Sequence, residues 1–182
     1  MVWIIVAIIV GLLVIYLISN YNSFVRLRNS VREAFSTMDV YLKKRWDMIP
    51  NLVETVKGYA KHEKETLEGV IKLRNGAYDA MSPEEKIDAN KELSRGITKI
   101  MALAEAYPDL KANTNFTDLS NQLSKIEDDI ANARKYYNAV VRKYNDKVEM
   151  FPSNLVAKMF GFKLEKMFEI VEEQRENVKV QF

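Results

Sequence analysis

The chain has 182 residues, 29% charged and 48% hydrophobic, with 6 Gly and 4 Pro, a balance that favours helices over a sheet protein of this size. Its net charge of +2, without a basic stripe interleaved with aromatic residues, argues against nucleic-acid binding. The absence of cysteine excludes disulfides, thiol catalysis and cysteine metal sites.

The first segment, residues 2–18, is apolar or aromatic throughout except for Gly11. As a helix rising about 1.5 Å per residue it extends about 26 Å, close to the thickness of a bilayer's hydrocarbon core. Trp3 and Tyr16 lie near its two ends, where amphipathic rings prefer the headgroup level. We therefore expect a transmembrane anchor over residues 1–19 that contacts the lipid bilayer through residues 2–18.

A cleaved signal peptide is the alternative interpretation of this segment. It would need positive charge before the apolar run and a small-x-small cleavage site after it. Only the terminal amine precedes the run here, and residues 17–21 make a poor cleavage site. We favour an uncleaved span.

The charges that flank the span predict its orientation. Arg26, Arg28 and Arg32 follow the span, and no acidic residue comes before Glu33. The positive-inside rule then predicts a single-pass protein of the plasma membrane, with its helical bundle in the cytoplasm and its N-terminus outside.

A helical seam follows the span, with apolar residues at alternating steps of three and four, typical of a helix that packs on other helices. Its members are Phe24, Leu27, Val31, Ala34, Met38 and Tyr41. At Pro50 the helix either kinks and continues or turns into a second helix over residues 52–81. We favour the turn, because one rod over residues 21–81 would leave half of its apolar stripe uncovered.

Later helices are marked by local signals. Ser82, Pro83 and Glu85 have the pattern of a capping box that starts a third helix, and Pro108 ends it. A polar loop over residues 109–116 and a cap at Thr117 precede the fourth helix. Its strictly four-three seam consists of Leu119, Leu123, Ile126, Ile130, Ala133, Tyr137, Val140 and Tyr144. We expect Tyr137 and Tyr144 to be core residues whose hydroxyls bond to Asn side chains or loop carbonyls.

The predicted fold is all-α. It consists of an N-terminal transmembrane helix, an antiparallel bundle of four long helices with coiled-coil packing over residues 20–149, and an amphipathic, Phe-rich C-terminal segment over residues 150–182. In an up-down-up-down bundle this last segment begins at the membrane-facing end. It then either folds back over the open end of the bundle, which we slightly favour, or contacts the membrane interface or a partner. The candidate contact residues are Phe151, Leu155, Met159, Phe160 and Phe162.

Motifs spread over nearly the whole chain resemble those of the LemA family. They are Tyr21-Asn22, residues 45–60 (RWDMIPNLVETVKGYA), His62-Glu63, residues 107–113 (YPDLKAN), Phe116, Ile126-Glu127, Tyr137-Asn138, Tyr144-Asn145, residues 151–154 (FPSN) and residues 160–162 (FGF). Trp46 departs from the family pattern, in which a smaller aromatic or polar residue is expected. The resemblance implies a bacterial single-pass membrane protein with a membrane-tethered helical bundle, and it implies no catalytic residue or cofactor.

Candidate chemistry is sparse. His62-Glu63 is the only histidine–carboxylate pair, and a solvated helix face explains it better than a metal site does. The acidic residues 127–129 point in different directions on a helix, which disfavours a shared cation site. We predict no catalytic residue, no metal, no cofactor and no small-molecule substrate; the protein is not expected to be an enzyme.

Arg45 and Asp47 are candidates for fixing the register of the helices. Arg45 falls on the apolar seam, so it is either a snorkelling side chain or half of a buried pair. We favour snorkelling.

The expected function is that of a membrane-anchored helical scaffold or interaction protein. The assembly state of the chain is the best test of this expectation. We expect a homo-oligomer at the membrane. The alternative is an adaptor or regulator of another membrane protein, such as a protease.

Overall fold

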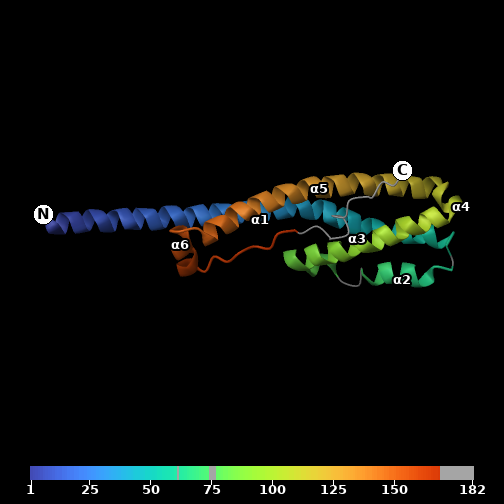
Figure 1. Cartoon of the computed structure of the whole chain (residues 1–182), viewed down its shortest axis with the longest axis horizontal. Helices are drawn as coiled ribbons and strands as arrows, with labels where there is room; N and C mark the ends of the chain where they lie inside the picture. The colour runs from blue at the N-terminus through green and yellow to red at the C-terminus, as the bar shows by residue number, and fades with distance from the viewer. Residues whose placement is uncertain (61, 74–76, 169–182) are drawn as a thin grey trace, which may run out of the picture. The chain divides into compact units, whose positions relative to one another are not determined.

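The computed structural model describes residues 1–60, 62–73 and 77–168. Every regular element within these ranges is helical, so the all-α prediction is confirmed. In chain order (Figure 1) the elements are α1 (Val2–Lys57), α2 (Lys64–Lys72), the 3-10 helix η1 (Tyr78–Ala80), α3 (Pro83–Ala106), α4 (Pro108–Lys111), α5 (Thr114–Glu149) and α6 (Ser153–Phe160).

The chain forms two compact units. The first consists of residues 1–36 and 134–167, and the second of the described residues between 37 and 133 together with Phe168. Both α1 and α5 therefore contribute residues to each unit.

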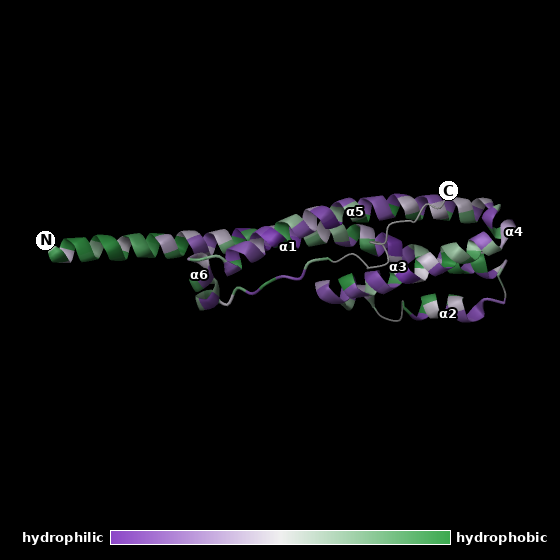
Figure 2. Ribbon diagram, in the orientation of Figure 1, coloured by the Kyte–Doolittle hydropathy of each residue, from purple (hydrophilic) through white to green (hydrophobic). Residues whose placement is uncertain are grey.

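The apolar stretch at the start of α1 belongs to the first unit. Residues 2–18 are almost all exposed, and Figure 2 shows them as a hydrophobic length of helix. The helix is long and apolar enough to cross a membrane. A membrane anchor and a signal sequence share this character.

The core of the first unit is aromatic. The ring of Phe24 stacks on that of Phe162, with centroids 4.7 Å apart, and its edge meets Tyr144. The buried Tyr137 donates its hydroxyl hydrogen to the carbonyl of Lys166 at 2.9 Å. The core position predicted for Tyr137, with a loop carbonyl as its partner, is therefore confirmed.

In the second unit the start of α3 is as predicted. The hydroxyl oxygen of Ser82 accepts the backbone N–H of Glu85 at 3.2 Å, and the Glu85 carboxylate accepts the backbone N–H of Ser82 at 2.7 Å. Pro83 occupies the first helical position. Pro108 begins α4 directly after the end of α3, so the predicted end of the third helix is confirmed as well.

The turn favoured at Pro50 is wrong, because α1 continues through Pro50 to Lys57. Ile49, Leu52 and Val53, which flank the proline, are all buried. The missing backbone N–H of one proline costs less than the loss of this apolar stripe would. The chain leaves the helix only after Lys57.

Two further boundaries differ from the predictions. The expected second helix over residues 52–81 is replaced by the end of α1, the nine-residue α2 and η1. The expected loop over residues 109–116 contains α4 and the start of α5. Asn113 caps α5 in place of Thr117, since its side-chain oxygen accepts the backbone N–H of Phe116 at 3.0 Å.

Candidate functional site

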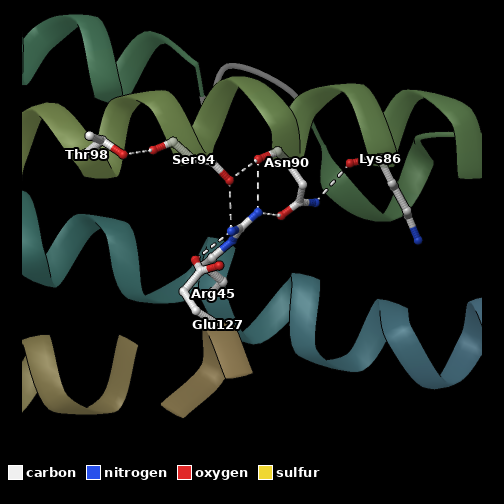
Figure 3. A network of polar contacts seen from close by, with 6 residues as sticks. All are labelled: Arg45, Lys86, Asn90, Ser94, Thr98 and Glu127. Atoms are coloured by element: carbon white, nitrogen blue, oxygen red, sulfur yellow. Dashed lines mark hydrogen bonds and ion pairs between the residues drawn. The ribbon is translucent and has the colours of Figure 1, made fainter. Parts of the chain in front are cut away.

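A buried arginine joins three helices of the second unit (Figure 3). Arg45 of α1 is 2% exposed. Its Nη1 atom donates to Oε1 of Glu127 in α5 at 2.6 Å and to Oγ of Ser94 in α3 at 3.0 Å. Its Nη2 atom donates to both the carbonyl and the side-chain oxygen of Asn90 in α3, each at 2.9 Å.

This arrangement shows that the snorkelling interpretation of Arg45 is wrong. A snorkelling side chain keeps its charged end in water, whereas this guanidinium is buried and paired. Burial beside α3 allows the carbonyl of Asn90 to compensate the lost hydration. Asp47, the second register candidate, forms a salt bridge with Lys43 at 2.6 Å on the surface of α1. That Arg45 fixes helix register stays a prediction.

A second polar cluster surrounds Tyr78. Its hydroxyl donates to Oδ1 of Asp39 at 2.7 Å, and Nζ of Lys86 lies 2.7 Å from the other oxygen of Asp39. The ring of Tyr78 contacts that of Trp46, with centroids 5.2 Å apart. Burial raises the pKa of Tyr78, and the hydrogen bond that its hydroxyl donates to Asp39 and the negative charge of Asp39 raise it further. The phenol is therefore a protonated hydrogen-bond donor that ties η1 to α1.

Neither cluster has the composition of a metal site. Among the residues that the structure describes, no group of three or more His, Asp or Glu side chains is placed to hold a metal ion. Glu127, the first acid of the run at residues 127–129, is engaged by Arg45. That the protein has no metal and no catalytic residue stays a prediction.

The candidate contact residues of the C-terminal segment divide between two environments in the first unit. Phe162 is buried, and the guanidinium of Arg28 lies 5.3 Å from the centre of its ring. The side chains of Phe151, Leu155, Met159 and Phe160 are exposed, and we call them the α6 face.

The α6 face lies close to the end of the apolar stretch of α1. The rings of Phe160 and Tyr21 have centroids 4.9 Å apart, and Tyr21 comes three residues after Ile18. One side of α6 is buried through Val156 and Ala157, while the other presents the α6 face. The segment thus folds back onto α1 and still leaves an apolar surface open.

A groove of about 570 Å³ opens in the first unit between residues 23–30 of α1 and residues 143–153. Three cationic side chains, Arg26, Lys143 and Lys147, line it with the single carboxylate of Asp146. We call it the basic groove.

Lys147 is held inside the basic groove by neutral groups. Its Nζ atom donates to Oγ of Ser23 at 2.7 Å and lies 5.2 Å from the centre of the Phe24 ring. Burial lowers the pKa of Lys147, and the positive charge of Arg26 lowers it further. An unneutralised cation in this position favours the approach of an anion.

Sequence reasoning missed the basic groove. Arg26 was identified only as a charge that flanks the span, and the lysines of α5 were not connected with it. The four-residue spacing of Lys143 and Lys147 places both on one face of a helix, which is the signal that could have found them. The pairing of that face with the start of α1 could not be inferred locally.

Comparison with known proteins gives consistent matches along the chain. A model of the LemA family matches residues 34–182. Protein LemA of Metamycoplasma hominis is 27% identical over 173 residues, which cover 93% of this chain and 78% of that protein. Magnetosome protein MamQ 2 of Paramagnetospirillum magneticum is 24% identical over 179 residues, covering 84% of this chain and 66% of that protein. Magnetosome protein MamQ of Magnetospirillum gryphiswaldense is 24% identical over 176 residues, covering 81% of this chain and 64% of that protein.

Proposed function

The chain belongs to the LemA family, and from this premise we propose that it is a membrane-anchored helical scaffold that assembles with copies of itself at the plasma membrane. In this proposal residues 2–18 span the bilayer, the N-terminus lies outside, and the helical bundle lies in the cytoplasm. The exposed apolar stretch of α1 supports the anchor. Arg26, Arg28 and Arg32 support the orientation.

The observation that carries the proposal is the open apolar surface of α6. Its neighbours Val156 and Ala157 are already buried in the first unit, so the α6 face remains available for a second contact. Contiguous exposed apolar surface on a folded protein marks interaction sites. Phenylalanine and methionine, which dominate the α6 face, are enriched in protein–protein interfaces.

A second copy of the chain is the occupant that fits this surface. The contact of Phe160 with Tyr21 places the α6 face close to the membrane span. Copies anchored in one bilayer share this depth, and confinement in the plane raises their effective concentration. An α6 face can therefore meet the same face of a neighbour.

Single-cysteine crosslinking of the full chain in native membranes tests this contact. The chain contains no cysteine, so Leu155→Cys introduces a unique thiol on the α6 face. Val40→Cys is the matched control, because Val40 is similarly exposed on α1. We expect an oxidised homodimer for Leu155→Cys and none for Val40→Cys.

The size of the particle completes the test. We expect the wild-type chain to form homomeric particles in detergent and in native membranes, and the Leu155→Gln, Met159→Gln double variant to be monomeric. A monomeric wild-type chain without a crosslink would overturn the proposal. A stoichiometric complex with a different protein would identify an adaptor or regulator instead. Protection of the C-terminus from external protease checks the orientation.

A further inference from the structure

We propose that the basic groove binds the phosphate of an anionic phospholipid headgroup from the bilayer that α1 crosses. This inference rests on the membrane anchor of the proposed function and does not require self-assembly, although Phe151 belongs both to the α6 face and to the lining of the basic groove.

The basic groove lies next to the headgroup layer. Residues 2–18 span the bilayer in the proposed function, so Ser23 and Arg26 lie about 8 Å and about 12 Å beyond Ile18, at 1.5 Å per residue. The headgroup region is about 5 to 7 Å thick on each side of the bilayer. Ser23 is therefore at the outer edge of this layer, and the long side chain of Arg26 can reach back toward the phosphates, because helical side chains point toward the N-terminus of their helix.

The basic groove carries an excess of positive charge, with three cations against the single carboxylate of Asp146. Arg26 and Lys143 are exposed and have no ion-pair partner among the residues that the structure describes. Lys147 is half-buried and donates to the neutral Oγ of Ser23. Since Ser23 accepts this hydrogen bond, its own O–H remains available to donate to a phosphate oxygen. A phosphate would thus gain charge-assisted hydrogen bonds that water alone does not replace.

The apolar side of the basic groove distinguishes a lipid from a free phosphate. Leu27, Met150 and Phe151 line it beside the cations, and Met150 and Phe151 are exposed. A small inorganic anion makes no use of these side chains. A phospholipid places its glycerol backbone and the first methylene groups of its chains against them.

Native mass spectrometry of the full chain in neutral detergent tests the proposal. The probes are dihexanoyl phosphatidylglycerol and dihexanoyl phosphatidylcholine, supplied together at equal concentration. We expect the wild-type chain to retain the anionic lipid preferentially. Arg26→Gln and Lys143→Gln should each reduce this preference about fivefold, the effect of one cation at an anionic membrane surface.

Arg32→Gln is the matched control, because it removes an exposed cation of α1 that does not line the basic groove. It should retain the wild-type preference. Equal retention of the two lipids, or a preference that Arg26→Gln and Lys143→Gln leave unchanged, would overturn the proposal. The fold of each variant is checked by its thermal melting curve.

Inorganic phosphate separates the two sources of the anion. We expect dihexanoyl phosphatidylglycerol to raise the melting temperature of the wild-type chain more than inorganic phosphate at the same concentration. Equal effects would show that the groove takes a free anion, which contradicts a lipid site. The same mass spectra report the number of chains per particle. A monomer that retains the anionic lipid preferentially would refute self-assembly and leave the lipid site supported.

Discussion

Nη1 of Arg45 lies 2.6 Å from Oε1 of Glu127, although 82 residues separate them in the chain. Arg45 is 2% exposed and Glu127 is 41% exposed, so the pair connects the interior of the second unit with its surface. Asn90, which is fully buried, accepts two hydrogen bonds from the same guanidinium. The cluster therefore links α1, α3 and α5 through one buried guanidinium.

Arg45→Ala should strongly destabilise the second unit, because it leaves the side-chain oxygen of Asn90 buried without its donor, while the carbonyl of Asn90 still accepts from Oγ of Ser94. We expect a loss of about 3 kcal/mol in the free energy of unfolding. Arg45→Met retains the volume of the side chain and should cost less. Arg95→Ala is the control, since Arg95 pairs with Glu92 on the surface, and its cost should stay within about 0.5 kcal/mol. Urea denaturation of the full chain in detergent, followed by circular dichroism, measures all three. Equal midpoints for Arg45→Ala and Arg95→Ala would contradict a structural role.

The parts of the fold that depend on local chemistry were predictable from the sequence. The capping box at Ser82 and Glu85 works through residues three apart, and most of the buried seam of α5 follows from its helical periodicity. The strict four-three spacing is wrong at Val140, because the structure buries Val141 instead. The apolar stretch of α1 is evident from composition. That the Phe-rich segment is a contact surface stays a prediction, and the burial of Phe162 depends on the ring of Phe24, which lies far away in the chain.

The rest depended on tertiary context. Proline is a helix breaker in local terms, and only the burial of Ile49 and Leu52 shows why α1 continues through Pro50. The paired state of Arg45 requires Asn90 and Glu127, which lie on other helices. The basic groove combines residues 23–30 of α1 with the end of α5, a pairing that no local pattern contains.

Pro50→Ala should stabilise the chain. Since α1 is continuous through this position, alanine restores the backbone hydrogen bond that proline cannot donate. Alanine also has a higher helix propensity than proline. We expect the free energy of unfolding to rise by about 1 to 2 kcal/mol. The gain is limited because proline also lowers the entropy of the unfolded chain, and replacing it by alanine removes this stabilising effect. The midpoint of urea denaturation measures the change. Asn51→Ala is the control for the general effect of a new alanine at this point of α1, because Asn51 is exposed and next to Pro50 in the helix. If Pro50→Ala were less stable than the wild-type chain, the proline would be needed for the conformation of the chain at this position, which contradicts this prediction.

Gly96 lies where α2 packs closely on α3. A Cβ atom at this position would come within 3.1 Å of Cγ2 of Val70 and 3.2 Å of Cδ1 of Leu73. Val70 is buried and stiff at its first torsion. We therefore expect Gly96→Ala to cost about 1 kcal/mol despite its better helix propensity.

Gly69→Ala is the matched comparison for Gly96. A Cβ atom at Gly69 would meet nothing within 4 Å, and the residue lies inside α2. This variant should gain about 0.5 to 1 kcal/mol. Urea denaturation of both variants gives the signs directly, and equal gains would show that α2 shifts to accept the new methyl group.

Tyr78 should make the stability of the second unit sensitive to alkaline pH. Its folded-state pKa lies above the ordinary value near 10, first because of burial and then because of Asp39. The unfolded chain therefore loses this proton as the pH rises past 10 while the folded chain keeps it, and stability falls. The free energy of unfolding falls by about 1.4 kcal/mol per pH unit for one such proton.

Tyr78→Phe should flatten the decline in urea midpoints between pH 9 and pH 11, whereas Tyr136→Phe, at an exposed position, should leave it unchanged. Parallel declines in all three chains would contradict the assignment.

Gly161 controls the direction in which the chain leaves α6. Its φ of 72° lies in the left-handed region, and the next backbone N–H, that of Phe162, donates to the carbonyl of Ala157 at 2.9 Å. This turn directs Phe162 onto Phe24. Gly161→Ala should cost about 1 kcal/mol through strain in the left-handed conformation. Gly161→Asn should cost less, because asparagine tolerates this region.

The consequence of Gly161→Ala for the α6 face follows from the same geometry. When Phe162 is displaced from Phe24, α6 loses an anchor in the first unit and Phe160 loses its fixed position beside Tyr21. Exchange of the α6 backbone amides with deuterium should therefore become faster in Gly161→Ala and change less in Gly161→Asn, while the amides of α3 in the second unit stay protected. Unchanged exchange in α6 of Gly161→Ala would show that Val156 and Ala157 alone hold the helix in place.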